Sequence, residues 1–438
     1  MAMKRFVGIA IVLCLLFLVA MPAIAAEEDD LVLGVYGNAN EDDTIDMRDL
    51  TYVKLIFFGK KPETELADAK YDGKINPLDF IQIKLIIVGK EKELTYVDIL
   101  GEPETVKKPI NRLVNLGWNG IDVTRMLDAR DIAVAVGSDY RSNLPISYPE
   151  ISKLPAVGAK ADTCDYEKIL SLEPDAVQTN IEAKWAIAGG SEQKRLFKEK
   201  LPNMPLISLN MREPETLSKN VMTYGYIIDR EDEAEEFCDW FEGYFDLIES
   251  RTEGLSDDER PRVYFEYRRY KTKGSGDRYS HWYIMAGGRN IADDKVGPDS
   301  PQYSRVFDVD PEYVVLQNPD FIFMHASTQL PATEHGYETD DTSTVAALSQ
   351  ELMNRPELAN VNAVKNGHVY VIDEALLGVA GTLMGAAYAA KVMHPQLFTD
   401  IDPEAIHQEY VDKFCHIDFD VSEHGVFVYP SYDVWSAI

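Results

Sequence analysis

The sequence predicts an α/β protein made of two similar lobes, joined by one long helix and preceded by a small all-α domain. Three observations support this fold class. A pattern of acid, short helix, Pro-Asp and apolar strand occurs twice, at 165–177 and 310–322. A long helical pattern, 231–253, lies between the two copies. Near the start of the chain, an oxygen-rich loop followed by an apolar helix also occurs twice.

Length and charge limit how many domains the chain can have and which classes of partner it can bind. At 438 residues the chain is too long for one ordinary core, so we expect two or three domains. The formal net charge of −31 repels nucleic acid and anionic lipid, and neither is an expected partner. Cys164, Cys238 and Cys415 are too few and too far apart in sequence for a disulfide framework.

Residues 1–26 have the features of a secretory signal peptide. Lys4 and Arg5 precede an uncharged apolar run that ends in small residues. We expect cleavage after Ala25 or Ala26 and an exported product, at the extracellular face of the membrane or in the periplasm. The apolar run is also long enough for the alternative, an uncleaved N-terminal anchor.

The two oxygen-rich loops lie within residues 27–95 and have the spacing of calcium loops. Oxygen-bearing side chains at alternate positions, with a carboxylate at the twelfth, are what a hard cation such as Ca²⁺ requires. The candidate ligands are Asn38, Asn40, Asp42, Asp46 and Asp49 in the first loop, and Asp68, Asp72, Asn76 and Asp79 in the second. Asp43 stands where such a loop has glycine, and Lys70 brings a positive charge to the second loop. We therefore expect a better first site than second.

Each loop runs into an apolar helix, 50–58 or 80–88, that is followed by Gly-Lys. On these features, residues 27–95 resemble a dockerin module, the paired calcium-loop and helix unit that docks onto cohesin-type receptors. The resemblance implies a cohesin-like receptor as a partner. The alternative is a degenerate helical pair that no longer binds metal.

Beyond this module, residues 96–110 lack hydrophobic periodicity and predict a linker. Short apolar runs and helical patterns then alternate through an N-terminal lobe, 111–230, and a C-terminal lobe with its tail, 254–438. This alternation favours a parallel sheet covered by helices in each lobe. Residues 231–253 have one apolar and one acidic face, and a helix of that length, about 35 Å, would reach from lobe to lobe.

Five stretches carry a second resemblance. They are 166–175, 286–292, 312–320, 363–372 and 390–398. On these stretches, residues 111–414 resemble the class III solute-binding proteins of ABC importers, those for iron-siderophore complexes, haem and cobalamin. The resemblance implies two Rossmann-like lobes joined by a single helix, a permease and its ATPase as partners, and no enzymatic activity. It also implies that Glu167 and Glu312, one per lobe, dock on arginines of the permease.

Ligands of α/β sheets lie beyond the carboxyl ends of the strands. Aromatic faces with a few cations at those ends suit a flat or aromatic anionic ligand, so we expect a metal chelate, an iron-siderophore first and cobalamin or haem next. Strand alternation puts Arg268 and Arg269 on opposite faces, so one of them is expected at the ligand. The candidate ligand-binding residues are Trp118, Asn119, Trp185, Tyr267, Arg268, Arg269, Tyr270 and His325.

Other side chains and other functions stay open. Glu374 follows the last strand, and Tyr279, His281, Trp282 and Tyr283 form a further aromatic cluster. An enzyme on the same scaffold is one alternative, although the sequence has no Gly-x-Ser-x-Gly elbow, no His-Glu-x-x-His and no phosphate-gripping glycine loop. The other is a dockerin-bearing cell-surface assembly protein that keeps the fold without transport.

Overall fold

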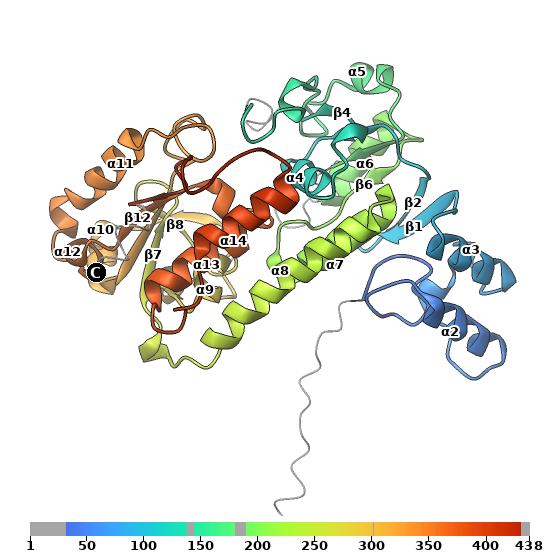
Figure 1. Cartoon of the computed structure of the whole chain (residues 1–438), viewed down its shortest axis with the longest axis horizontal. Coiled ribbons are helices and arrows are strands. Elements are labelled where there is room, and N and C mark those ends of the chain that lie inside the picture. Colours follow the sequence, from blue (N-terminus) through green and yellow to red (C-terminus); the bar gives the residue numbers. More distant parts are fainter. Residues whose placement is uncertain (1–31, 138–143, 180–189, 301, 431–438) are drawn as a thin grey trace, which may run out of the picture.

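The computed structural model describes residues 32–137, 144–179, 190–300 and 302–430. The expected signal peptide, Trp185 and the last eight residues of the tail lie outside the described residues. The described part of the chain forms two α/β lobes and a small helical module on the N-terminal side (Figure 1). Within it, no helix combines the length and the apolar character needed to cross a membrane.

The N-terminal module contains the two helices that its repeat predicts. They are α2 (Met47–Phe57) and α3 (Pro77–Ile87), and each begins with a capping box, Asp46 with Asp49 and Asn76 with Asp79. The two helices pack on each other. The twelfth residue of each loop therefore serves as the third residue of the helix that follows it.

The segment expected to be a linker forms most of an antiparallel hairpin instead. Strands β1 (Glu93–Val97) and β2 (Pro103–Lys107) pair along their length. Leu94, Tyr96 and Val106 are fully buried. The strands alternate apolar and polar residues over only five positions each, which is too short a pattern to stand out between charged residues.

Hydrogen bonds and an ion pair hold the module and hairpin to the N-terminal lobe. The hydroxyl of Tyr96 donates to the Leu206 carbonyl (3.2 Å), and that of Tyr226 accepts from the Ile45 N–H (3.1 Å). The ammonium of Lys108, whose side chain is 2% exposed, lies 2.6 Å from Glu91 and 2.6 Å from Asp229 of the N-terminal lobe. The module thus docks on the lobe through buried polar contacts.

A four-stranded parallel sheet forms the centre of the N-terminal lobe. Its order is β4-β3-β5-β6. The elements are β3 (Leu113–Asn115), α4 (Trp118–Met126), β4 (Ala133–Val136), α5 (Tyr166–Ser171), β5 (Ala176–Gln178), α6 (Gly190–Lys200), β6 (Leu206–Ile207) and α7 (Pro214–Ile228). The strands agree with the expected pattern. The expected pattern contains no counterpart of α7, which begins with Pro214 in its first turn and packs along the inter-lobe helix.

The C-terminal lobe has a five-stranded sheet of order β13-β12-β11-β7-β9. Its first elements are β7 (Arg262–Glu266), β8 (Lys271–Lys273), α9 (Arg278–Met285), β9 (Arg289–Asn290), β10 (Val306–Asp308), α10 (Pro311–Gln317) and β11 (Phe321–His325). Then follow α11 (Ser343–Met353), α12 (Asn362–Asn366), β12 (Val369–Ile372), α13 (Gly381–Met393), α14 (Pro403–Tyr410) and β13 (Val428–Tyr429). The tail, left without an account by the sequence, pairs antiparallel with β12 through β13.

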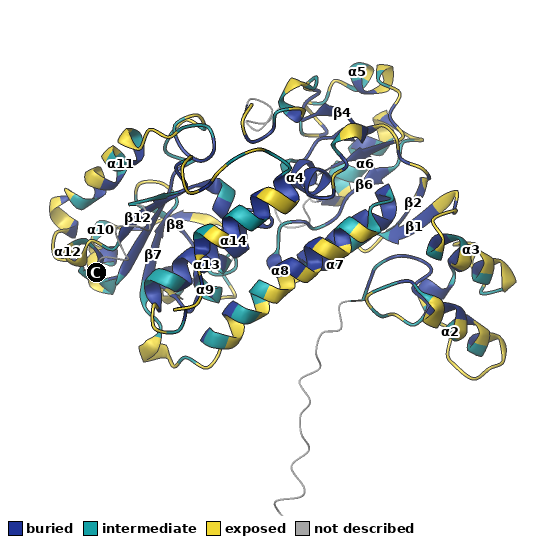
Figure 2. Ribbon diagram, in the orientation of Figure 1, coloured by how far each residue is buried: buried dark blue, intermediate teal, exposed yellow. Residues whose placement is uncertain are grey.

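One long helix, α8 (Glu231–Thr252), lies between the lobes in sequence and contacts both, as the periodicity predicts. It packs against α7 of the N-terminal lobe and against α9 and α13 of the C-terminal lobe. Figure 2 shows exposed residues along the outer side of α8, whereas α13 is buried along most of its length. A helix buried all round, as α13 is, needs apolar residues on every face.

The sequence repeat has a matching structural repeat in the two lobes. Asp175 accepts hydrogen bonds from the backbone N–H groups of Asn111 (2.8 Å) and Arg112 (2.9 Å), at the start of the first sheet. Asp320 accepts one from the N–H of Arg262 (3.0 Å), at the start of the second. In each lobe, the Pro-Asp thereby ties the end of one helix to the first strand.

The helix starts of the two copies differ in one respect. Asp165 caps α5 by accepting from the Lys168 N–H (3.0 Å), but the side chain of Asp310 makes no such bond to α10. Pro311 occupies the first turn of α10, and proline has no N–H that a cap would need to satisfy there. The expected acid cap is therefore present in only one copy.

Candidate functional site

The two lobes meet where the carboxyl ends of their parallel strands lie, which is where such sheets bind ligands. From the N-terminal lobe come Trp118, the first residue of α4, and Arg212, which follows β6. Helix α9, strand β8 and the ends of β7, β11 and β12 bring the C-terminal side chains. We call the whole set the inter-lobe cluster: Trp118, Arg212, Tyr267, Lys273, Arg278, Tyr279, His325 and Glu374.

Trp118 connects the two lobes within this cluster. The guanidinium of Arg278 lies 4.6 Å from the centre of the indole ring, and that of Arg212 lies 5.9 Å from it. A Cβ atom at Gly378 would come within 2.9 Å of the same ring, so only glycine allows this approach. Cations from both lobes therefore face one aromatic ring across the boundary.

Glu374 organises the C-terminal half of the cluster. Its carboxylate accepts from the hydroxyl of Tyr279 (3.0 Å), lies 3.3 Å from the guanidinium of Arg278 and lies 2.7 Å from Nε2 of His325. All four side chains are buried. Buried polar groups that satisfy one another in this way fix one another's positions.

The pKa values of the three cations of the cluster are not all shifted in the same direction. Burial and the neighbouring charge of Arg278 lower the pKa of Arg212 to about 10. Burial lowers the pKa of Lys273 as well, although its ammonium lies 2.9 Å from Asp277. For Arg278, burial is outweighed by Tyr279 and then Glu374, so its pKa is raised. A bound anion would offset the cost of holding Arg212 and Lys273 charged.

A small cavity opens beside the cluster at the lobe boundary. It has a volume of about 50 Å³ and is lined by Arg125 and Tyr148 from the N-terminal lobe and by His335 and Glu374 from the C-terminal lobe. Glu338 of the C-terminal lobe accepts from the N–H of Ser147 (2.9 Å). The lobes therefore make direct hydrogen bonds on this side.

Three of the expected ligand-binding residues belong to the cluster. They are Trp118, Tyr267 and His325, and the rings of Tyr267 and His325 stack 5.3 Å apart. Asn119 follows Trp118 in α4, is 2% exposed, and its Oδ1 has no hydrogen-bond partner among the described residues. Trp185 lies outside the described residues.

Of the two adjacent arginines, one of which was expected at the ligand, Arg268 lies beside the inter-lobe cluster and Arg269 lies away from it. Arg269 is exposed and forms an ion pair with Glu351 of α11, and Tyr270 donates a hydrogen bond to Glu357 (2.6 Å). Arg268 is exposed, with its guanidinium 5.8 Å from the ring of Tyr267. The chain turns after β7, and Arg269 lies against α11 whereas Arg268 stays beside Tyr267.

The cations that the structure does gather were not among the expected ligand-binding residues. Arg212 comes five residues after the end of β6, so the rule of carboxyl ends applied to that strand would have pointed to it. Arg278 follows Asp277, whose side chain caps α9 by accepting from the Tyr279 N–H (3.1 Å). The start of this helix could be predicted from the sequence, but the position of Arg278 against Trp118 could not.

The two residues expected to dock on a permease occupy matching surface positions. Glu167 in α5 and Glu312 in α10 are both exposed in the first turn of a short helix. An apolar side chain is exposed three residues later in each helix, Leu170 (52%) and Val315 (39%). Helices α5 and α10 both lie on the side of the lobes away from α8 (Figure 1).

In both oxygen-rich loops the twelfth carboxylate receives hydrogen bonds from the loop backbone. Asp49 accepts from the Asn40 N–H (3.1 Å), and Asp79 accepts from the Lys70 N–H (2.9 Å). Both aspartates are fully buried. Burial raises the pKa of Asp49 to about 6 and raises the pKa of Asp79. A cation in the loop would favour the ionised carboxylates.

An arginine occupies part of the first loop. Arg48 lies 2.9 Å from Asp42 and 2.9 Å from Asp46, two of the expected calcium ligands. The side chain of Arg48 is 58% exposed, so solvent screens these pairs. The sequence pointed only to Lys70 as a positive charge near a ligand position, because Arg48 is the eleventh residue of the first loop and does not occupy a ligand position.

Comparisons with known proteins agree with this architecture. The sequence profile described as "Periplasmic binding protein" matches residues 113–376, more than half of the chain. The N-terminal module lies outside the matched region. Over 349 residues the chain is 21% identical to the molybdate-binding protein MolA of Haemophilus influenzae, which covers 72% of this chain and 89% of MolA.

Solved structures show the same fold. MolA bound to molybdate has a TM-score of 0.60 at 20% identity, covering 74% of this chain and 98% of that one. The TroA-like periplasmic binding protein FepB of Veillonella parvula has a TM-score of 0.64 at 23% identity, covering 76% and 98%. The Ni-His complex of Helicobacter pylori CeuE has a TM-score of 0.56 at 16% identity, covering 76% and 98%.

Proposed function

Because the chain belongs to the periplasmic binding protein family, we propose that it is the exported solute-binding component of an ABC importer. In this role it binds an anionic ligand, a metal chelate first, between its lobes and delivers it to the permease and its ATPase. The observation that carries the proposal is the inter-lobe cluster, where Arg212 and Arg278 from different lobes face Trp118. The protein acts by binding and release, not as an enzyme.

A chelate fits the chemistry of the cluster. The rings of Trp118, Tyr267 and Tyr279 offer flat apolar faces, and Arg212 and Arg278 offer charge to carboxylate or catecholate oxygens. The chain has a formal net charge of −31, so a group of cations at the boundary between the lobes points to a particular role, the binding of an anion. An iron-siderophore is the first candidate, and cobalamin or haem comes next.

A small oxyanion is the second candidate. Two guanidinium groups near one point, with a lowered pKa for Arg212, suit a compact dianion as well as a chelate. The relative MolA is named for binding molybdate. A small anion would depend mainly on the arginines, whereas a chelate would also depend on the aromatic rings.

Thermal unfolding of the exported chain with a ligand panel tests the proposal. The panel contains ferric siderophores, haem, cobalamin, molybdate and tungstate. A ligand at 100 times its dissociation constant adds about 2.7 kcal/mol, so one class should raise the Tm by several degrees. No shift with any class would contradict the transport role and favour a cell-surface assembly protein on the same scaffold.

We also propose that Glu167 and Glu312 seat the two lobes on basic residues of the permease. Their matched exposure, each with an exposed apolar side chain one turn later, supports this role. Two carboxylates on separate rigid helices would fix both register and orientation.

For the N-terminal module we propose a dockerin-like role in which Ca²⁺ occupies the first loop more tightly than the second. The convergence of both loops on a buried aspartate, Asp49 or Asp79, supports this proposal. Exposed apolar residues at the end of α2 and on α3, such as Phe58 (74%) and Ile81 (52%), suit docking onto a cohesin-like receptor.

Calorimetric titration of Ca²⁺ into the full exported chain tests the metal claim. Asp49→Asn should remove the tighter site and Asp79→Asn the weaker one. Because the pKa of Asp49 is about 6 without a cation, binding at pH 6 should release about half a proton per ion, and much less at pH 8. No heat from wild type, or identical isotherms for both variants, would contradict the calcium proposal.

A further inference from the structure

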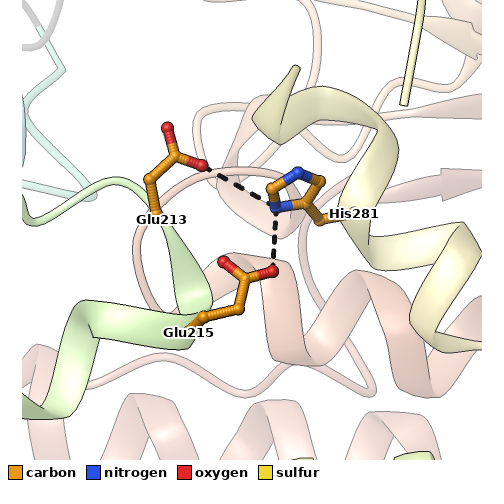
Figure 3. Close-up of side chains that lie close together, drawn as sticks. All are labelled: Glu213, Glu215 and His281. Atoms are coloured by element: carbon orange, nitrogen blue, oxygen red, sulfur yellow. Dashed lines mark ion pairs between the residues drawn. The ribbon is translucent and has the colours of Figure 1, made fainter. Parts of the chain in front are cut away.

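A second group of ligating side chains connects the two lobes on one side of the inter-lobe cluster. Glu213 is the N-cap of α7, and Glu215 lies in the first turn of the same helix. His281 lies in the middle of α9. Figure 3 shows both carboxylates directed at one nitrogen of the imidazole. The N-terminal lobe thus supplies two ligand atoms and the C-terminal lobe supplies one.

The three ligand atoms have the spacing of a metal site. Nδ1 of His281 lies 3.3 Å from Oε1 of Glu215 and 3.8 Å from Oε2 of Glu213, and all three atoms lie within 4.8 Å of one another. Ligand atoms at the zinc distances of about 2.0–2.2 Å stand about 3.4 Å apart in a tetrahedron. An ion would fit between these atoms after only small side-chain movements.

The imidazole gives an independent reason to expect a ligand. Nδ1 of His281 is shielded from solvent and makes no hydrogen bond to any described residue. A buried polar nitrogen without a hydrogen bond is costly, and binding a metal ion would remove that cost. The carboxylates stand on the same side of the ring, where the ion would bind.

We propose that Glu213, Glu215 and His281 bind a divalent transition-metal ion of the Zn²⁺ class that clips α7 to α9. Imidazole favours such ions over Ca²⁺ and Mg²⁺, which prefer oxygen ligands alone. Two carboxylates and a neutral imidazole also balance the charge of a divalent ion.

The surroundings leave room for entry and for a water as the fourth ligand. A cavity of about 870 Å³ is lined by Glu215 and His281, together with Glu249 and Lys219. Among the described residues, two carboxylates, those of Glu215 and Glu249, line this cavity with one ammonium, that of Lys219. The cavity therefore carries an excess of negative charge that would attract a cation.

Such an ion would stabilise the arrangement of the two lobes that this structure shows. Its ligands come from both, so opening the lobes would break at least one metal–ligand bond. The inference does not depend on which solute the cluster binds, because it concerns a different set of side chains.

Cobalt titration of the exported chain tests the site. Co²⁺ serves as a spectroscopic probe for the Zn²⁺ class, with excess Ca²⁺ present to fill the N-terminal loops and no solute added. One Co²⁺ per chain should give visible d–d absorption that Zn²⁺ displaces. The variants are Glu215→Gln, Glu213→Gln and His281→Asn, with circular dichroism to check folding. His424→Asn is the matched control, since His424 is an exposed histidine 3.1 Å from Asp340.

Each of the three variants at Glu213, Glu215 or His281 should weaken Co²⁺ binding by about 100-fold or more. Losing a side chain that binds the metal directly costs at least as much affinity as losing one that only hydrogen-bonds to such a ligand. His424→Asn should bind as wild type does, and Zn²⁺ should raise the Tm of wild type and of His424→Asn only. Glu215→Gln alters an exposed side chain, 59% exposed, so it tests the site even if His281→Asn misfolds. Absence of d–d absorption in wild type, or its persistence in all three variants, would overturn the proposal.

Discussion

The two lobes contribute unequal sets of side chains to their common boundary. In the C-terminal lobe, Arg278 is tied to Glu374 (3.3 Å), and the same carboxylate also contacts Tyr279 and His325. In the N-terminal lobe, Arg212 instead faces Trp118, and burial with the charge of Arg278 lowers its pKa. The C-terminal half is therefore assembled around an internal ion pair, whereas the N-terminal cation is held at a cost in free energy.

This difference suggests separate tasks for two residues of the same type. Arg278 stabilises the fold of its own lobe and presents one face to the boundary. The folded-state pKa of Arg212, about 10, lies below the ordinary arginine value, so at any pH below about 10 its charge lowers the stability of the unliganded protein. With an anion bound, the charge of Arg212 would stabilise the protein instead. On the outer surface the lobes are alike, since Glu167 and Glu312 occupy equivalent positions.

The largest expected effect concerns the outer surface. A double Glu167→Ala, Glu312→Ala variant should weaken binding to the importer by more than about 100-fold, since a charge-assisted hydrogen bond contributes about 1.5–3 kcal/mol. The single variants should lose similar amounts, because the sites are equivalent. Uptake by vesicles containing the permease and ATPase measures this, with an Asp162→Ala, Asp299→Ala variant as the control of equal charge. Full uptake with the double variant and intact ligand binding would exclude the docking role.

The next effect distinguishes the inner faces. Arg278→Gln should lower the free energy of unfolding by about 3 kcal/mol, because Glu374 would stay buried without its cation. Ligand affinity should fall as well. Denaturant unfolding without ligand measures the first change and titration measures the second. A variant as stable as wild type would mean that the pair with Glu374 does not hold this lobe together.

Arg212→Gln should behave in the opposite way. Affinity for the anionic ligand should fall by about tenfold, as expected for one charged hydrogen bond, while the unliganded protein keeps or gains stability. The same two measurements apply. If Arg212→Gln destabilised the unliganded chain as much as Arg278→Gln, the proposed difference between the lobes would be wrong.

The smallest effect concerns the ring that both cations face. Trp118→Leu removes two cation–π contacts, each about 0.5–2 kcal/mol, and should weaken a chelate by about fivefold to tenfold. Trp118→Phe should recover part of that loss. A small oxyanion should be affected less than a chelate, because it gains nothing from an aromatic face. Calorimetric titration of both ligand types compares the two candidate functions.

Much of the fold was legible in the sequence because it rests on local periodicity. The pattern of 231–253 gave α8 almost to the residue, and the alternation of runs gave the four strands of the N-terminal lobe and β7, β11 and β12 of the C-terminal lobe. The hairpin β1-β2 and helix α7 were missed. Their sequences, Glu93–Lys107 and Pro214–Ile228, have short or interrupted patterns that tertiary packing stabilises.

The site was less predictable, because it depends on which strand ends meet across the lobes. Trp118, Tyr267 and His325 were found from the rule of carboxyl ends. Arg268 and Arg269 satisfied the same rule, but the turn after β7 carries Arg269 to α11. The role of Arg278 could not be predicted, since it depends on contacts with residues almost a hundred positions away in the sequence.

Calorimetric titration of the ligand found by the unfolding screen tests the central claim, that cations from both lobes hold an anion between them. Wild type should bind one ligand per chain, Arg212→Gln and Arg278→Gln should each bind more weakly, and the double variant should give no heat at concentrations that saturate wild type. Binding of the ligand to the double variant with wild-type affinity would contradict the account.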